Sequence, residues 1–267
     1  MTAFIKAHAY GNDFLYVPAD ALPGADLAAC ARRLCDRHRG IGADGLILYT
    51  LTDEGASMTL LNADGSVSEL SGNGLRGLAA IVARARAERG DARRGIDVDT
   101  SAGRKHLTLQ RANGSAYLFA AEMGQPENIH QATLEAAGDR ILATVLSVGN
   151  PQCVVLGPLP DDERFARLGA ALERHPYFPN RTNVEFAEIE SPDRIRIRIW
   201  ERGVGPTESS GTGSCGAAVA AASHGGAARS LEVIAPGGAQ QVVWTDDGLT
   251  LTGWAEILAD GTYRAQL

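Results

Sequence analysis

The chain has 267 residues and a formal net charge of −7 at pH 7, with 45% hydrophobic and 21% charged residues. This composition is typical of a soluble globular protein with one or two domains and substantial cores. The acidic balance provides no basic surface for nucleic acid, and no apolar run is long enough to cross a membrane. Residues 1–10 lack the apolar core of a secretory signal, so we expect a cytoplasmic protein.

The residue patterns that usually mark a metal or cofactor site are missing. The four cysteines form neither a CxxC pair nor a zinc-binding spacing; they are Cys30, Cys35, Cys153 and Cys215. A glycine-rich loop at 39–45 lacks the Lys-Ser/Thr continuation of a phosphate-binding loop. We therefore expect no metal and no cofactor.

The first half of the chain predicts short strands around one buried helix. A weakly alternating segment at 3–8 meets a Gly11-Asn12 turn that leads into a strand. Further on we expect an amphipathic helix at 25–37, strands at 46–49 and 58–62, an Ala-rich buried helix at 75–87, and strands at 96–100, 106–110 and 116–121. Residues 124–140 are polar and punctuated by Pro and Gly, which indicates a connection and a domain boundary.

The second half predicts the same design. We expect helices at 161–174 and 217–222, and strands at 141–148, 153–156, 183–186, 194–200, 231–233, 240–245, 249–258 and 263–267. The fold class is therefore α+β, with an N-terminal domain at 1–125 and a C-terminal domain at 126–267. The last strands are left free to return to the N-terminal domain.

One short stretch occurs twice and organises both halves. Ser71-Gly72-Asn73-Gly74 recurs 139 positions later as Ser210-Gly211-Thr212-Gly213, and each copy leads into an Ala-rich helix. Gly11-Asn12 recurs at nearly the same offset as Gly149-Asn150, and a polar residue precedes each serine by nine positions, Asn62 in one half and Glu201 in the other. Such an ordered series at one offset indicates duplication of a half-chain unit.

Each copy has two interpretations. Glycines at a helix entrance let the backbone approach a ligand, and the free N–H groups of the first turn attract an anion. Serine is also a preferred helix N-cap, so either copy alone could be merely structural. Two copies together favour a carboxylate held between two helix N-termini.

These stretches resemble diaminopimelate epimerase along nearly the whole chain. The resemblance is carried by Gly11–Phe14, Arg39–Gly45, Asn62–Ser66, Gly72–Arg76, Gly149–Pro151, Asn183-Val184, Glu201–Gly205 and Gly211–Gly213. It implies two pseudo-symmetric, barrel-like domains, each around a central helix, with the active site between them. It also implies cofactor-free chemistry, in which two cysteines exchange the α-proton on opposite faces of the substrate.

The departures from the family pattern concern the reaction itself. Ser71 and Ser210 stand where the family has its two catalytic cysteines. Gln152 replaces a histidine that assists one thiol, and Pro206 replaces a glutamate usual after Gly-Val-Gly. A serine hydroxyl is far less acidic than a thiol and needs its own base to abstract a proton. Glu69 and Glu208, each two residues before its serine, are the candidate bases, with Glu201 as a third.

Three functions remain open at this stage. The chain could be an epimerase or racemase of the diaminopimelate type, converting the LL to the meso form with Ser71 and Ser210 as catalytic residues. It could be a superfamily lyase or other isomerase with one-sided proton abstraction. It could also be a silent amino-acid binder, whether inherited or engineered by replacing both cysteines.

The retained polar residues indicate the substrate. By resemblance, the distal groups of diaminopimelate are held by Asn62, Asn183, Glu201 and Arg202, and the same cleft is lined by Asn12 and Asn150. Donors to the reacting carboxylate come from Gly72, Asn73, Gly211 and Thr212. Because Arg suits bidentate carboxylate recognition, we expect a small amino acid with a second charged end as the partner. A homodimer is compatible with this interpretation.

Overall fold

The computed structural model describes residues 1–265, which fall into two compact units. Unit 1 comprises Met1–Ala121 together with Gly253–Leu267, and unit 2 comprises Glu122–Thr252. Two strands, β8 (Ala116–Gly124) and β17 (Gly248–Tyr263), run from one unit into the other. The chain therefore crosses between the units in both directions.

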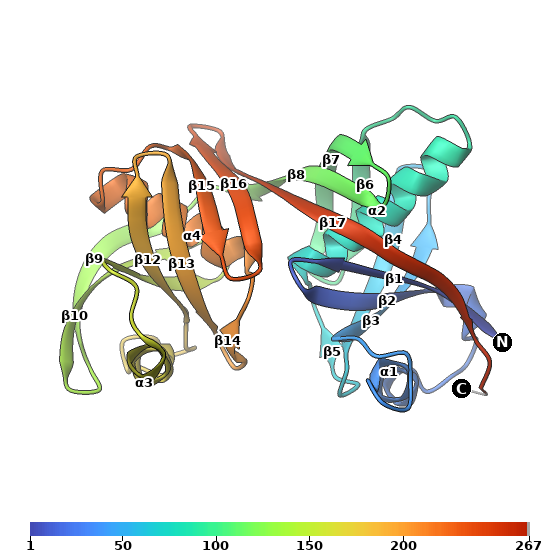
Figure 1. The fold of residues 1–267 in the computed structure, drawn as a ribbon, viewed down its shortest axis with the longest axis horizontal. Coiled ribbons are helices and arrows are strands. Elements are labelled where there is room, and N and C mark those ends of the chain that lie inside the picture. The colour runs from blue at the N-terminus through green and yellow to red at the C-terminus, as the bar shows by residue number, and fades with distance from the viewer. Residues whose placement is uncertain (266–267) are drawn as a thin grey trace. The chain divides into compact units, whose positions relative to one another are not determined.

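Unit 1 is a closed barrel. Its remaining barrel strands are β1 (Thr2–Ala9), β2 (Asn12–Pro18), β3 (Gly45–Leu51), β4 (Gly55–Asn62), β6 (Gly95–Thr100) and β7 (Gly103–Asn113) (Figure 1). In the described residues the strands pair in the order β1-β2-β3-β4-β6-β7-β8-β17, and β17 pairs back with β1. The short strand β5 (Val67–Ser68) pairs with β4, and the short helix η1 (Ala19–Ala21) and α1 (Leu27–Cys35) lie between β2 and β3.

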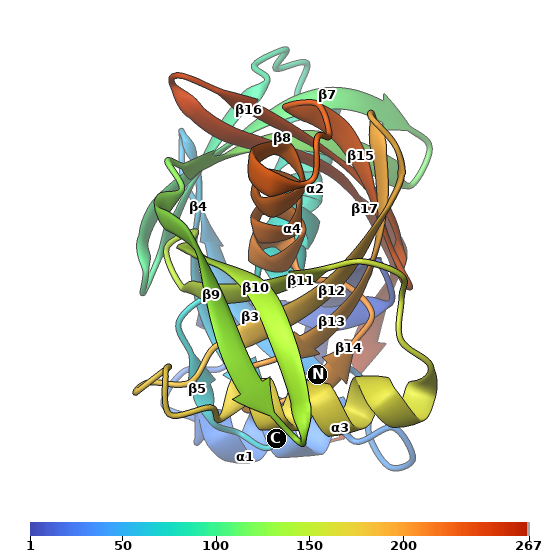
Figure 2. The ribbon, with the colours of Figure 1, turned by 90° about the vertical axis from the view of Figure 1, so that its left-hand side faces the viewer.

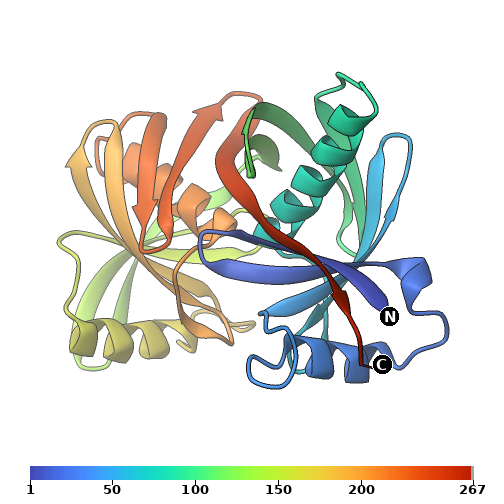
Figure 3. The same ribbon diagram turned by 45° about the vertical axis from the view of Figure 1, so that its right-hand side comes forward.

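Helix α2 (Gly72–Glu88) forms the centre of unit 1, and Figure 3 shows it with the strands of its barrel around it. It contains Ala, Leu and Arg, which are good helix formers, and no proline. Apolar residues lie on every side of it, because strands surround it; Leu78 and Ile81 pack in one core with Tyr16 and Ile96.

Unit 2 repeats this plan. Its strands are β9 (Glu127–Ala136), β10 (Asp139–Ser147), β11 (Pro151–Leu156), β12 (Asn183–Ser191), β13 (Arg194–Glu201), β15 (Ser230–Ala235), β16 (Gly238–Thr245) and the start of β17. Gly248 of β17 lies against Gly124, just before β9, and this contact closes the ring. Figure 2 shows helix α4 (Gly211–His224) inside this ring. Helix α3 (Asp162–Glu173) and the short strand β14 (Gly205–Thr207) complete the unit.

The two units have matching strand connections, as the sequence repeat predicts. The parallel pairs β2–β3 and β4–β6 of unit 1 correspond to β11–β12 and β13–β15 of unit 2. Each central helix follows the second strand of an antiparallel pair, β3–β4 or β12–β13. The predicted fold class is confirmed: two pseudo-symmetric α+β barrels, each around a central helix.

Two expectations about strands were wrong. Residues 124–140 contain β9, which pairs along most of its length with β10, where the sequence predicted a polar connection. The strand was missed because only Leu134 and Ala136 are fully buried, so most of its side chains are polar. The expected break between strands at 249–258 and 263–267 is also absent, since β17 continues to Tyr263; residues 266–267 lie outside the described part.

Within residues 1–265, no helix combines the length and the apolar content needed to span a bilayer.

Candidate functional site

Ser71 caps the first turn of α2. Its Oγ accepts a hydrogen bond from Gly74 N–H at 3.1 Å, and its carbonyl accepts one from Leu75 N–H at 2.8 Å. A Cβ at Gly74 would lie 2.7 Å from Cδ1 of Ile47, so only glycine lets this turn pack against β3. Within the helix, the N–H groups of the first residues are left to bind an anion.

Ser210 caps α4 in the same way. Its Oγ accepts from Gly213 N–H at 3.2 Å, and its carbonyl accepts from Ser214 N–H at 2.9 Å. A Cβ at Gly213 would lie 2.7 Å from Glu185 Oε1 on β12. Both serines are therefore N-caps, as the structural interpretation predicted. A hydroxyl that accepts a capping bond still has its own proton to donate, so capping and reactivity are compatible.

The asparagine loops lie beside the helix N-termini in both units. Asn73 Nδ2 donates to Asn12 Oδ1 at 3.4 Å, and Asn150 Nδ2 donates to Thr212 Oγ1 at 3.3 Å. In each unit the second residue of the central helix is thus bonded to an asparagine at the start of a barrel strand, Asn12 as the first residue of β2 and Asn150 just before β11. Asn12 is further held by Asp44 at 2.7 Å.

A row of polar side chains crosses three strands of unit 2 below α4. Gln152 on β11 pairs with Asn183 on β12, and Glu201 comes opposite Asn183 because it follows Trp200, the partner of Val184. The corresponding row in unit 1 is Phe14, Gly45 and Asn62. The row in unit 2 therefore consists of three polar side chains, whereas Asn62 is the one polar residue of the row in unit 1.

Comparison with known proteins identifies the family. The family model described as Diaminopimelate epimerase matches residues 4–129 and 144–258. The diaminopimelate epimerase of Desulforudis audaxviator is 40% identical over 97% of this chain and 98% of its own length. That of Desulfitobacterium hafniense is 35% identical over 96% of each chain. The chain belongs to the diaminopimelate epimerase family.

Solved structures share the fold at low sequence identity. A Pseudomonas aeruginosa protein named a predicted epimerase has a TM-score of 0.71 at 17% identity and covers each chain completely. A hydroxyproline epimerase from Agrobacterium vitis has a TM-score of 0.60 at 17% identity, covering 97% of this chain and 90% of its own. At this identity the likeness establishes the architecture alone.

In this member of the diaminopimelate epimerase family, Ser210 is paired with Glu201. The side chains of Ser210 and Glu201 interact, and Glu201 stands at the end of β13. Burial raises the pKa of Glu201 above its ordinary value, although the hydrogen bond from Ser210 lowers it. Of the three candidate bases, Glu201 is therefore the one that interacts with a serine of the repeated stretch.

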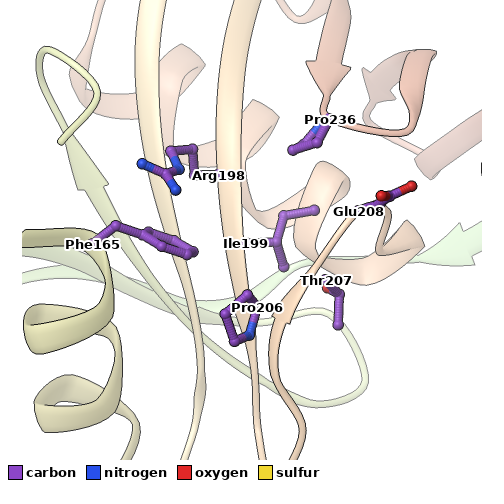
Figure 4. Close-up of a pocket in the computed structure, with 7 residues that line it drawn as sticks. All are labelled: Phe165, Arg198, Ile199, Pro206, Thr207, Glu208 and Pro236. Carbon is purple, nitrogen blue, oxygen red and sulfur yellow. The ribbon is translucent and has the colours of Figure 1, made fainter. Parts of the chain in front are cut away.

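The other two candidate bases are exposed. Glu69 precedes α2 on the surface, and Glu208 lies on the rim of a hollow of about 320 Å³ on unit 2. Figure 4 shows Glu208 there among the other lining residues, which include Phe165, Arg198 and Pro206. The two candidates chosen by their position two residues before a serine therefore lie on the surface, whereas Glu201 is partly buried at the end of β13.

Arg202 lies in a turn that is fixed from three sides. Its N–H donates to Asn183 Oδ1 at 2.9 Å, and its Nη1 donates to the carbonyl of Asn180 at 3.3 Å. Its exposed guanidinium forms no ion pair with any described residue. Asn183 itself is buried and donates to the carbonyl of Pro151 at 3.3 Å.

Sequence reasoning missed Glu173, which holds the same turn. It is only 2% exposed, at the end of α3. Its Oε1 accepts from Gly203 N–H at 2.9 Å and its Oε2 from Trp200 Nε1 at 3.1 Å. The sequence carried no signal for this role, because the partners lie about thirty residues away in another element.

The remaining candidates in unit 1 are more exposed. Asn62 is exposed and held within its own turn, where its Nδ2 donates to Ser66 Oγ at 2.9 Å. Gly72 is also exposed at the start of α2. These groups can reach a ligand, but no carboxylate occupies the Asn62 position.

The four cysteines are buried, and none of them forms a disulfide. Burial raises the pKa of Cys35 to about 12 and that of Cys153 still further. Thiols with raised pKa values are poor nucleophiles and bases at neutral pH.

Proposed function

We propose that the protein is a cofactor-independent amino-acid isomerase of the diaminopimelate type, with Ser71 and Ser210 in place of the two catalytic cysteines. Family membership supports the reaction class. The repeated construction of a serine-capped helix beside an asparagine supports equivalent roles for the two serines.

The observation that carries the proposal is the position of Glu201, on the same sheet face as Glu185 beside the first turn of α4, where its carboxyl group interacts with Ser210. A serine needs an adjacent base, and Glu201 supplies one. As Ser210 Oγ takes the α-proton, its own proton moves to Glu201, so one C–H bond breaks and one carboxyl O–H bond forms. The carbanion is stabilised by the substrate carboxylate, which the N–H groups at the start of α2 and α4 would hold.

The substrate proposal follows from the polar residues around this pair. Asn12, Asn150 and Asn183 would bind its amino and carboxylate groups. Arg202 has an exposed guanidinium on a fixed turn, which suits the carboxylate at a second charged end. The donors to the reacting carboxylate would be Gly72, Asn73, Gly211 and Thr212, and the distal amino group would meet Asn62 and Glu201.

A second candidate function is one-sided proton abstraction, as in a lyase. It is favoured by the unequal half-sites, because the position of Glu201 is occupied by Asn62 in unit 1. Ser71 then lacks the carboxylate partner that Ser210 has. On this basis the Ser210 face should exchange its proton faster than full inversion occurs.

The test is incubation of LL-diaminopimelate in deuterium oxide with the purified protein, followed by mass spectrometry and separation of stereoisomers. We expect deuterium at the α-carbon, and Glu201→Gln should slow its uptake by about 10²- to 10⁴-fold. Glu208→Gln is the matched control and should leave uptake unchanged. Formation of an unsaturated or deaminated product would select the lyase, and failure to bind or exchange diaminopimelate would refute both.

A further inference from the structure

Glu185 on β12 is a buried acid that the proposed reaction does not use. Its exposed fraction is 0%, and neither carboxyl oxygen has a hydrogen-bond partner among the described residues. An ionised carboxylate without partners is very costly in such surroundings. Burial accordingly raises the pKa of Glu185 well above its ordinary value, and the charge of Glu201 raises it further.

Glu185 lies directly behind Ser210. The position of a Cβ at Gly213 is 2.7 Å from Glu185 Oε1 and 3.2 Å from Ser210 Oγ, so both oxygens surround one point in the first turn of α4. Glu185 also shares a sheet face with Glu201. Ile199 is the partner of Glu185 on β13, and Glu201 is two residues further along that strand, one diagonal step away.

The equivalent position in unit 1 is Ile47. Its Cδ1 lies 2.7 Å from the Cβ position at Gly74, just as Glu185 Oε1 does at Gly213. In unit 1 an apolar side chain, that of Ile47, therefore fills this space, and it contributes packing alone. The carboxyl group in unit 2 is not needed to build the barrel, and it occurs next to the serine that has Glu201 as its partner.

We propose that Glu185 and Glu201 form a carboxyl pair that holds a single proton beside Ser210. This inference rests on the proposed function. Two carboxyl groups one diagonal step apart on a sheet, one of them fully buried, cannot both ionise readily, and two protonated carboxyls could not accept the proton of Ser210. With one proton on the pair, Glu201 accepts from Ser210 while Glu185 stays neutral. The pair returns the proton to Ser210 Oγ when Oγ reprotonates the carbanion.

A thiol on a neighbouring strand is a further titratable group. The charge of Glu185 raises the pKa of Cys153 on β11, whose partner on β12 is Val184. Burial raises the pKa of Cys153, so that thiol stays neutral where the carboxyl pair titrates. The pH dependence of this end of α4 should then come from the two glutamates.

The test is a pH titration of the full-length protein labelled with carboxyl-¹³C glutamate, read by NMR. In the wild type we expect two coupled steps for Glu185 and Glu201. In Glu201→Gln the midpoint of Glu185 should fall by about one pH unit or more, since coupling of that size defines an interacting pair. Glu188→Gln removes an acid from the opposite face of β12 and should move neither midpoint. If Glu185→Gln fails to fold, Glu185→Ile is used in its place, because isoleucine is the residue at the equivalent position of unit 1.

Deuterium uptake from labelled solvent gives the functional readout. If Glu185 and Glu201 form this pair, deuterium uptake should fall at low pH, where both carboxyl groups are protonated. It should also fall at high pH, where the pair loses its remaining proton. Glu185→Gln should abolish the high-pH limb and leave the low-pH limb. An unchanged Glu185 midpoint in Glu201→Gln, or an unchanged high-pH limb in Glu185→Gln, would overturn the inference. Coupled titration without any uptake would instead refute the proposed function and leave the pair standing.

Discussion

Replacing Glu173 should loosen the turn that carries Glu201 and Arg202. The Glu173 carboxylate is the acceptor for both Trp200 Nε1 and Gly203 N–H, and its backbone carbonyl accepts from Thr182 N–H at 3.2 Å. It therefore connects the end of α3 to the turn after β13 and to the start of β12. Arg202 depends on this connection, because its own N–H is bound to Asn183 at the start of β12.

The magnitude follows from the two side-chain bonds. A hydrogen bond to a charged group contributes about 1.5–3 kcal/mol to stability. Glu173→Ala loses two, although solvent can replace part of the bond at the exposed Gly203, so we expect a loss of about 3–5 kcal/mol. Glu173→Gln keeps the size and one acceptor oxygen and should lose about 1–3 kcal/mol. In a chain of this size that corresponds to a fall in Tm of about 2–4 °C per kcal/mol.

The assay is thermal unfolding of Glu173→Gln beside Glu163→Gln, an exposed acid of the same helix that should change stability by less than about 0.5 kcal/mol. Diaminopimelate binding should weaken in the first variant alone. Burial raises the pKa of Glu173, but its hydrogen bonds and two nearby arginines lower it below the ordinary value. The contribution of the Glu173 carboxylate to the free energy of unfolding is therefore complete above the unfolded-state pKa. It is lost as the pH falls through the lower folded-state pKa. Equal Tm values and equal binding for both variants would refute the positioning role.

Two further predictions concern the helix N-termini. The double replacement Ser71→Cys/Ser210→Cys should increase epimerisation by at least tenfold and make it sensitive to iodoacetamide, since a helix N-terminus stabilises a thiolate. A triple variant that also carries Gln152→His is the fairer comparison. No gain in activity in this triple variant would contradict the proposed roles of the two serines. Gly213→Ala should destabilise the protein by about 1–3 kcal/mol in urea unfolding, because its Cβ would meet Glu185 Oε1 at 2.7 Å, and an unchanged midpoint would show that Glu185 is not packed against the turn.

The sequence determined those parts of the protein that depend on short stretches of chain. The repeated Ser-Gly-x-Gly stretch predicted two capped central helices, because an N-cap and its glycine lie within four residues of each other. The common offset predicted two similar barrels, since a duplicated segment folds under the same local rules. β9 was the exception, as its largely polar surface gave no alternation to recognise.

Only the tertiary structure decided which acidic side chains lie beside Ser210. Glu69 and Glu208 are near the serines in sequence, yet both are exposed, whereas Glu201 interacts with Ser210 from the end of β13. Glu185 reaches the same helix turn from β12, twenty-five residues before Ser210. Strand register places these groups together, and register is set by pairing between distant segments and by burial of one sheet face. The sequence therefore predicted the helix N-termini, while the carboxyl groups around Ser210 became visible only when the strands were paired.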